Sequence, residues 1–305
     1  MTGFPYRGRF APSPTGPLHF GSLVAAVGSY LDAKAEGGEW LVRIEDVDRP
    51  RTVAGAADAI LRTLDALGVG WDGEVLYQSR RDEAYRAALA DLERSGMVYP
   101  CACSRKEIAD SSFTGPAGLI YPGTCRPGLP PGRSGRAVRL RVEGEIAFAD
   151  RLQGEIRQDL EREVGDFVLR RADGLFAYQL AVVVDDAEQG ITHVVRGADL
   201  LDSTPRQIYL QGLLGLAVPS YLHLPVAVNQ RREKLSKQTL APEVDLARPA
   251  ELLCRVLRFL DQEPPPGLEA GGLEACWTWA VSHWRPERLA GVLTRSAGDP
   301  ACNGP

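Results

Sequence analysis

Hydrophobic and polar positions form alternating strand-like and helical patterns in the first part of the chain. Residues 8–11 read as a short strand, and residues 21–35 follow with their large apolar side chains on one helical face. The apolar run 39–44 predicts a buried strand, and residues 53–67 predict a second helix that ends at Gly68. Strands that alternate with helices predict an α/β fold built on a parallel sheet.

The hydrophobic pattern changes in the middle of the chain. Cysteine, glycine and proline dominate residues 98–136, where periodicity is lost, so we expect an irregular segment that needs a ligand or metal to be ordered. Further runs are helical at 82–95 and 204–215 and strand-like at 137–142, 165–171, 176–186 and 223–229.

Two of these regions carry further expectations. The apolar run 176–186 is expected to be a buried strand that ends at Asp185 and Asp186, to which we assign a structural role. A polar loop, QRREKLSKQ, follows the last strand-like run, and residues 242–305 are helix-biased except for a break at EPPPG.

Composition narrows the class of protein. A chain of 305 residues predicts two domains, or one large domain with an insertion. Its 44% hydrophobic and 25% charged residues are typical of a globular enzyme and exclude a largely disordered chain, and a net charge of −5 excludes a basic coat over the whole surface. The start of the chain has no signal-like apolar run, and no apolar stretch could span a bilayer. We therefore expect a cytoplasmic monomer with reduced cysteines and no membrane partner.

The first candidate motif is PSPTGPLHFG, between the first strand and its helix. A strand-to-helix crossover in an α/β sheet is where nucleotides bind, and a helix N-terminus favours phosphate oxygens. Gly16 and Gly21 permit close approach of the backbone to a ligand, Pro12 stiffens the turn, and His19 can donate to a phosphate. On its own such a turn is more often structural than functional.

The second candidate motif is Lys234-Leu235-Ser236-Lys237 in the polar loop. The chain holds only four lysines among its 35 basic residues, and two of them are three positions apart here. Two ammonium groups on a loop suit a phosphate that gains negative charge during a reaction.

Together the two motifs resemble the HIGH-like and KMSKS-like signatures of class I aminoacyl-tRNA synthetases. The surrounding segments RFAPSPTGPLHFGSL, RIEDVD, DGLFAYQLAVVVDD and ITHVVRGADLLDSTPRQ are similar to the glutamyl/glutaminyl branch of that class, over residues 8–240. The resemblance implies a Rossmann-like parallel sheet that is split by an inserted α+β domain containing a zinc-binding segment. The implied boundaries are a first catalytic half at 1–80, an insert at 81–175 with the zinc segment at 101–125, a second catalytic half at 176–241, and a short helical C-terminal region at 242–305.

The number of residues after the second motif indicates which family within the glutamyl/glutaminyl branch the chain resembles. Only 68 residues follow Lys237, too few for the anticodon-binding region of a glutamyl-tRNA synthetase. The branch usually has the motif RG-x-DH, whereas residues 196–200 of this chain read RGADL. Ala198 stands at the variable position, and Leu200 replaces the usual histidine. These features resemble the glutamyl-Q tRNA(Asp) synthetase family, which places glutamate on queuosine in the anticodon loop of tRNA(Asp).

The resemblance also implies site residues. Arg9, Ser13, Glu45, Tyr178 and Arg196 match positions that bind L-glutamate, with Glu45 at the α-ammonium and the arginines suited to carboxylates. His19, Lys234 and Lys237 match the catalytic positions, and the ATP-binding set is Pro12, Gly16, His19, Gly21 and Lys237. Mg²⁺ would accompany ATP. Surface ion pairs, a helix cap and core packing are the alternative roles for the glutamate-site residues.

Three cysteines and a tyrosine make a candidate metal site. Cys101, Cys103 and Cys125 offer thiolates, and no histidine lies in the segment. The glutamyl-Q tRNA(Asp) synthetase family carries the same Cys-x-Cys…Tyr-x3-Cys arrangement as a zinc site, and this resemblance adds Tyr121 as the fourth ligand. We expect one structural Zn²⁺ per chain. The alternative is three idle or buried cysteines in a loop, the role that we expect for Cys254, Cys276 and Cys302.

The implied reaction has two steps. Glutamate and ATP give glutamyl-adenylate, with or without RNA present, and the glutamyl group then passes to queuosine on tRNA(Asp). A minimal glutamyl-tRNA synthetase that charges tRNA(Glu) at its 3′ end, a HIGH-superfamily nucleotidyltransferase for a small molecule, and an inactive RNA-binding paralogue are the alternatives. The run Arg126, Arg133, Arg136, Arg139 and Arg141 is a candidate for phosphate contacts, or equally a solvated strand edge.

Overall fold

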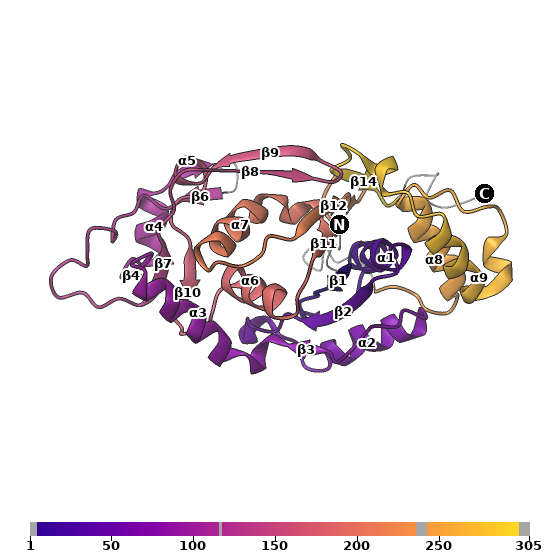
Figure 1. The fold of residues 1–305 in the computed structure, drawn as a ribbon, viewed down its shortest axis with the longest axis horizontal. Coiled ribbons are helices and arrows are strands. Elements are labelled where there is room, and N and C mark those ends of the chain that lie inside the picture. Colours follow the sequence, from indigo (N-terminus) through magenta and orange to yellow (C-terminus); the bar gives the residue numbers. More distant parts are fainter. Residues whose placement is uncertain (1–4, 116–117, 236–242, 299–305) are drawn as a thin grey trace.

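A parallel sheet lies at the centre of the molecule (Figure 1). The computed structural model describes residues 5–115, 118–235 and 243–298. Three parallel strands run in the order β1–β2–β3, with bounds Arg7–Phe10, Glu39–Ile44 and Leu76–Tyr77. Two more parallel strands are β11 (His193–Gly197) and β12 (Ser220–Leu224). The backbone N–H of Thr192 donates to the carbonyl of Arg7 at 2.9 Å and joins β11 to β1. The predicted α/β fold with a parallel sheet is therefore confirmed.

Helix α1 (Phe20–Ala35) packs on this sheet. It contacts β1, β2 and β11 and buries Leu23, Val27 and Leu31 completely. A Cβ at Gly28 would lie 2.4 Å from Leu224 Cδ1, so a larger residue there would force the Leu224 side chain to move. The first predicted helix is thus confirmed, and the second is shorter than predicted, at α2 (Ala56–Ala66).

The run 176–186 is a helix, so the prediction of a buried strand was wrong. Helix α6 spans Tyr178–Glu188 and packs between α3 (Asp82–Arg94) and α7 (Thr204–Leu213). Its residues Gln179–Val183 are all buried, and so are Asp185 and Asp186. A helix that is covered on most sides has no polar face, so its sequence loses the 3.6-residue period, and three consecutive valines then resemble a strand.

A second group of elements lies at one end of the molecule, around α3, α4 and β4 in Figure 1. We use the name inserted unit for the described residues of 98–140 and 168–170. An antiparallel sheet has the order β10–β7–β4, with bounds Val168–Arg170, Ala137–Leu140 and Val98–Cys101. Helix α4 (Arg105–Ser111) begins with a capping box in which Ser104 and Glu107 bond reciprocally to backbone N–H groups. The short strands β5 (Phe113–Gly115) and β6 (Gly118–Ile120) form a hairpin. Residues 98–136 are therefore more regular than predicted.

A long antiparallel hairpin, which the sequence analysis did not predict, runs from this unit back to the parallel sheet (Figure 1). It consists of β8 (Glu145–Asp150) and β9 (Gly154–Asp159), and β8 pairs with β12 through Asp150 and Tyr221. Most of its side chains are exposed or half-exposed, so its hydrophobic pattern is weak. The short helix α5 (Leu160–Glu163) follows.

The C-terminal region lies at the other end of the molecule, against α1 (Figure 1). Helices α8 (Pro249–Phe259) and α9 (Gly272–Ser282) bear out the helix bias, but β14 (Thr294–Ser296) was not predicted; it pairs in parallel with β13 (Val226–Val228). The remaining short 3₁₀ helices are η1 (Arg49–Arg51), η2 (Gln78–Arg80), η3 (Ala198–Ser203), η5 (Leu268–Gly271) and η6 (Pro286–Leu289). In the described part of the chain, no helix has both the length and the apolar character needed to cross a membrane.

Candidate functional site

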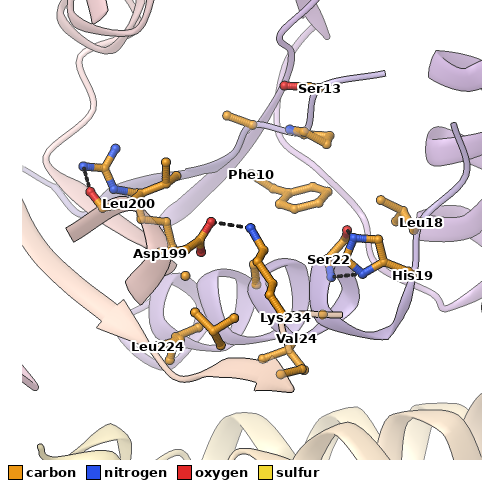
Figure 2. Close-up of a pocket in the computed structure, with 18 of the residues that line it drawn as sticks. Phe10, Ser13, Leu18, His19, Ser22, Val24, Asp199, Leu200, Leu224 and Lys234 are labelled. Atoms are coloured by element: carbon orange, nitrogen blue, oxygen red, sulfur yellow. Dashed lines mark hydrogen bonds and ion pairs between the residues drawn. The ribbon is translucent and has the colours of Figure 1, made fainter. Parts of the chain in front are cut away.

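A pocket of about 740 Å³ opens at the carboxyl ends of β1, β11 and β12, beside the N-terminus of α1 (Figure 2). This edge of a parallel sheet is where α/β proteins bind ligands. Nearly all the described residues that the sequence predicted for the site line this pocket: Arg9, Pro12, Ser13, His19, Gly21, Glu45, Tyr178, Arg196 and Lys234. Gly16 lies in the same turn with φ of +142°, a conformation that favours glycine. Lys237 lies outside the described residues.

One wall of the pocket is the start of α1. His19 is the N-cap of this helix, and its Nδ1 accepts a hydrogen bond from the backbone N–H of Ser22 at 3.3 Å. Its Nε2 lies 3.0 Å from Ser22 Oγ (Figure 2). A Cβ at Gly21 would come within 3.3 Å of the His19 ring, so glycine leaves room for the imidazole at the helix start. The wall presents an imidazole and a helix N-terminus, which suits phosphate oxygens.

The opposite, deeper wall is a buried cluster of charges. Arg9 donates to both carboxylate oxygens of Asp186, at 3.0 and 3.3 Å. Arg43, which is wholly buried, meets Asp186 at 2.7 Å and Glu45 at 3.3 Å. Asp186, predicted to be a structural residue at a strand end, thus lies on α6 as the shared partner of two arginines. Two cations and two anions balance here.

The pKa values of the two carboxyl groups in this cluster are shifted in opposite directions. Burial raises the pKa of Glu45 above its ordinary value, although Arg43 and Arg9 oppose that rise. Burial also acts to raise the pKa of Asp186, but the charges of Arg43 and Arg9 and their hydrogen bonds lower it overall. Asp186 is therefore the ionised partner of the arginines, whereas burial favours the neutral form of Glu45.

Arg196 lies between the charge cluster and β12. Its Nη1 lies 3.5 Å from the Tyr178 hydroxyl, and its Nη2 donates to Thr204 Oγ1 at 2.9 Å. Its Nε donates to His223 Nε2 at 3.1 Å. Arg196 is 5% exposed, and its side chain extends from β11 to the pocket.

A lysine and an aspartate meet across the mouth of the pocket. Lys234 Nζ lies 2.6 Å from Asp199 Oδ2 (Figure 2). Lys234 follows β13 and bridges to Val228, while Asp199 lies in η3 after β11. Asp199 was not predicted as a site residue, although it lies in the RGADL segment close to Arg196.

Apolar side chains form a further part of the lining. They include Leu18, next to His19, Val24, next to Lys234, and Leu200 and Leu224 (Figure 2). Flat aromatic rings of a ligand could be enclosed by such side chains, while the polar groups at the walls set its orientation.

The three predicted cysteines also come together, in the inserted unit. The Sγ atoms of Cys101, Cys103 and Cys125 lie within 4.8 Å of one another. The Tyr121 hydroxyl lies 3.5 Å from Cys101 Sγ and 3.4 Å from Cys103 Sγ, and accepts a hydrogen bond from the Cys125 N–H at 2.9 Å. Burial acts to raise the pKa of Cys125, but hydrogen bonds, first from the Ala102 backbone and then from Tyr121, lower it to about 7. Three sulfurs and one phenolic oxygen are a chemically suitable donor set for Zn²⁺.

The other cysteines lie apart from this cluster. Cys254 and Cys276 are fully buried, with their Sγ atoms 3.7 Å apart in the C-terminal helices, as expected for apolar core residues. Cys302 lies outside the described residues.

Most arginines of the run beside the cysteines contact carboxylates or tyrosine rings of the protein itself. Arg126 pairs with Asp166 at 2.7 Å, and Arg133 pairs with Glu107 at 2.6 Å. Arg139 is buried 3.8 Å from the centroid of the Tyr121 ring, and Arg141 stacks on Tyr99. Four of the five arginines therefore make contacts within the protein, and Arg136 is exposed. Phosphate contact by the run stays a prediction.

The chain is similar in sequence to one family throughout. The profile of the family described as tRNA synthetases class I (E and Q), catalytic domain, matches residues 6–115 and 132–250. A glutamyl-Q tRNA(Asp) synthetase of Dechloromonas aromatica is 68% identical over 92% of this chain and 94% of its own length. Proteins of the same name from Chromobacterium violaceum and Pseudomonas aeruginosa are 60% and 56% identical, over 96% and 95% of this chain and 98% and 97% of their own lengths.

Solved structures show the same fold. A glutamate-tRNA synthetase of Elizabethkingia anophelis superposes with a TM-score of 0.80 at 22% identity, over 98% of this chain and 69% of that protein. A glutamate tRNA ligase of Elizabethkingia meningosepticum, solved in complex with its amino acid, gives a TM-score of 0.79 at 23% identity, over 98% of this chain and 68% of that protein. The likeness extends over the inserted unit and the C-terminal helices as well as the parallel sheet.

Proposed function

The chain belongs to the glutamyl-Q tRNA(Asp) synthetase family of class I synthetase-like ligases, and from this premise we propose that it activates L-glutamate with ATP and transfers it to queuosine in tRNA(Asp). The observation that carries this proposal is the pocket. It combines buried arginines and a carboxylate at one wall with an imidazole, a helix N-terminus and a lysine at the other. Such a site can bind an amino acid next to a triphosphate.

We assign glutamate to the wall that contains Arg9, Glu45 and Arg196. Glutamate carries two carboxylates and one ammonium, so it needs cationic and anionic partners together. Glu45 would accept from the α-ammonium, the two arginines would donate to carboxylates, and Tyr178 and Ser13 would complete the contacts. The 3.5 Å separation of Arg196 Nη1 and the Tyr178 hydroxyl supports a shared ligand atom between them.

We assign the ATP phosphates to the α1 wall. Pro12, Gly16 and Gly21 shape the turn, and His19 and Lys234 face the space beside it. Lys237 would join them from the same loop. Mg²⁺ bound with ATP would offset charge on the phosphates. The apolar side chains Leu18, Val24 and Leu224 support an adenine position.

The first step forms a mixed anhydride. An oxygen of the glutamate α-carboxylate attacks the α-phosphorus of ATP, and the bond to pyrophosphate breaks. No protein nucleophile is needed, so this chain contributes position and charge stabilisation. His19 and the lysines stabilise the negative charge that builds on the phosphate oxygens.

The second step moves the glutamyl group. A hydroxyl of the queuosine cyclopentene ring attacks the carbonyl carbon of the adenylate, an ester forms, AMP leaves, and the hydroxyl proton is released. Specificity against aspartate comes from the reach of the arginines. Specificity against glutamine comes from the cost of leaving a buried arginine without its carboxylate.

We also propose that Cys101, Cys103, Tyr121 and Cys125 hold one structural Zn²⁺. The convergence of four donor atoms in a segment with few apolar side chains supports this. The ion would cross-link β4 to the irregular chain before β7, and would leave no ligand position for a reacting water.

The test of the activation step is ATP–pyrophosphate exchange with purified protein. We expect exchange with glutamate, measured with and without RNA, and far less with glutamine or aspartate. The variant Lys234→Ala should lower the exchange rate, whereas Lys106→Ala, in the inserted unit, should not. Absence of exchange under both RNA conditions would contradict the proposal and favour an inactive RNA-binding paralogue.

A further inference from the structure

Arg196 differs in its partners from Arg9, which also lines the pocket, and from the buried Arg43 beside Glu45. Arg9 and Arg43 each meet a carboxylate within 3.0 Å. Arg196 instead donates to an imidazole nitrogen, to a hydroxyl and, at 3.5 Å, to the carbonyl of Leu200. Among the residues that the structure describes, no carboxylate oxygen lies within 4 Å of its guanidinium. Its hydrogen-bond acceptors are therefore all uncharged, provided that His223 is neutral.

The surroundings of His223 favour the neutral ring. His223 is fully buried, and its Nδ1 lies 2.6 Å from Asp150 Oδ2. Asp150 also accepts from the backbone N–H groups of Leu152, Gln153 and His223, so its carboxylate is well satisfied as an anion. A proton on Nδ1 completes the bond to Asp150, and Nε2 then presents its lone pair to Arg196.

The electrostatics agree with this geometry. Burial lowers the pKa of His223, and the charge of Arg196 lowers it further, against the opposing effects of Asp150 and of the charge of Asp199. The other groups that face the ring are the Tyr221 ring, stacked with centroids 6.2 Å apart, and the Thr204 hydroxyl, 3.2 Å from Nε2. A cationic ring would place an N–H against the N–H of Arg196, which is unfavourable.

We propose that Asp150 and His223 are positioning residues that aim Arg196 into the pocket through an uncharged acceptor, so that its charge remains available to a substrate carboxylate. This inference rests on the proposed function. The imidazole takes Nε, Thr204 takes Nη2, and Nη1 is left toward Tyr178 and the pocket. A carboxylate in place of the imidazole would hold the side chain equally well, but it would compete with the substrate for the same cation. The ring therefore separates the buried carboxylate of Asp150 from the guanidinium.

A matched pair of variants tests the role of charge. His223→Gln and His223→Glu both place an oxygen near the position of Nε2, and they differ in charge. We expect the Glu variant to show a KM for glutamate at least about tenfold higher than that of the Gln variant, with the KM for ATP equal within about twofold. The same pair in an Asp150→Asn background removes the second carboxylate that would face Glu. Equal glutamate KM values for Gln and Glu in both backgrounds would overturn the proposal.

A third variant separates positioning from core filling. His223→Asn keeps a polar atom near Nδ1 but nothing that reaches Arg196. A positioning role predicts a higher glutamate KM for Asn than for Gln at similar melting temperatures, whereas a role in packing alone predicts parallel losses of stability and unchanged KM values.

The wild-type protein provides a measurement that needs no variant at position 223 and no activity. The chain contains four histidines, so ¹⁵N NMR of histidine-labelled protein can be assigned by replacing His19, His193 and His283 in turn. We expect His223 to be neutral at pH 7 with its proton on Nδ1. A cationic ring, or a proton on Nε2, would overturn the inference whether or not the protein activates glutamate. Failure of glutamate-dependent exchange in the wild type would instead count against the proposed function.

Discussion

At the residue scale, the guanidinium of Arg196 is the group whose shape and charge both matter. Arg196→Lys keeps the charge but loses the planar fork that reaches His223, Thr204 and the pocket together. A hydrogen bond to a charged group contributes about 1.5–3 kcal/mol, and the lysine cannot make all the hydrogen bonds of the guanidinium at once. We expect kcat/KM for glutamate to fall by roughly 30-fold or more. Steady-state pyrophosphate exchange measures it.

Two controls accompany this variant. The KM for ATP should stay near the wild-type value, and Arg86→Lys on the exposed side of α3 should leave all constants unchanged. If Arg196→Lys retained the wild-type kcat/KM for glutamate, Arg196 would not be a glutamate-binding residue.

The pKa of Glu45 predicts a pH dependence. Burial raises that pKa above 4.5, so Glu45 loses its charge at a higher pH than an exposed glutamate would. The neutral acid cannot pair with the α-ammonium. The KM for glutamate should therefore rise as the pH falls through this raised pKa, while the KM for ATP changes less.

The variant Glu45→Gln checks the assignment. This variant should bind glutamate weakly at neutral pH, and its KM for glutamate should no longer rise as the pH falls. If the rise persists in Glu45→Gln, another group is responsible.

Individual site residues could be predicted where a motif marks them. The turn around His19 and the loop around Lys234 are local patterns, and both line the pocket. Asp199, Asp150 and His223 are contributed by separate segments, and nothing in their local sequence indicates which arginine or lysine they meet. Their roles follow from tertiary contacts alone.

At the element scale, the apolar runs of helix α1 and strand β2 were assigned to the correct element type, although both elements are largely buried. Helix α6 is also covered on most sides and was misread as a strand. The β8–β9 hairpin failed for the opposite reason, because most of its side chains are at least half-exposed. The segment 98–136 has a local signal, the Ser104–Glu107 capping box, that would have located α4.

The cysteine segment carries a prediction about metal removal. We expect about one equivalent of zinc per chain, lost in Cys125→Ser and retained in Cys254→Ala. Loss of the ion should speed hydrogen exchange and proteolysis within 98–136, because few apolar side chains hold this segment. Metal analysis and hydrogen-exchange mass spectrometry measure the two effects.

Glutamate-dependent exchange should persist without zinc, because the pocket lies at the parallel sheet and the cysteines lie in the inserted unit. A metal-free wild type, or unchanged protection after metal removal, would contradict the structural role.

At the scale of the whole molecule, one buried carboxylate joins distant parts of the chain. Asp32 on α1 accepts from Tyr6 at 2.5 Å, from Arg151 at the β8–β9 turn at 2.6 Å, and from Trp284 near the C-terminus at 3.0 Å. Asp32 is 1% exposed, while Arg151 is one-third exposed. It thereby connects the start of the chain, the long hairpin and the C-terminal region.

Asp32→Asn should lower the free energy of unfolding by somewhat less than the about 3–5 kcal/mol of a fully buried broken pair, because water reaches Arg151. Denaturant titration measures this loss. Asp91→Asn removes an exposed pair with Arg94 and should cost less than about 1 kcal/mol. Equal small losses for both variants would show that Asp32 does not hold these parts together.

The central claim concerns the RNA acceptor, and transfer of labelled glutamate with ATP tests it most directly. Three RNAs are compared: queuosine-containing tRNA(Asp), the same tRNA(Asp) without queuosine, and tRNA(Glu). We predict label on the first RNA alone. Label on tRNA(Glu) would contradict the account and would indicate a minimal glutamyl-tRNA synthetase, and equal label on both forms of tRNA(Asp) would exclude queuosine as the acceptor.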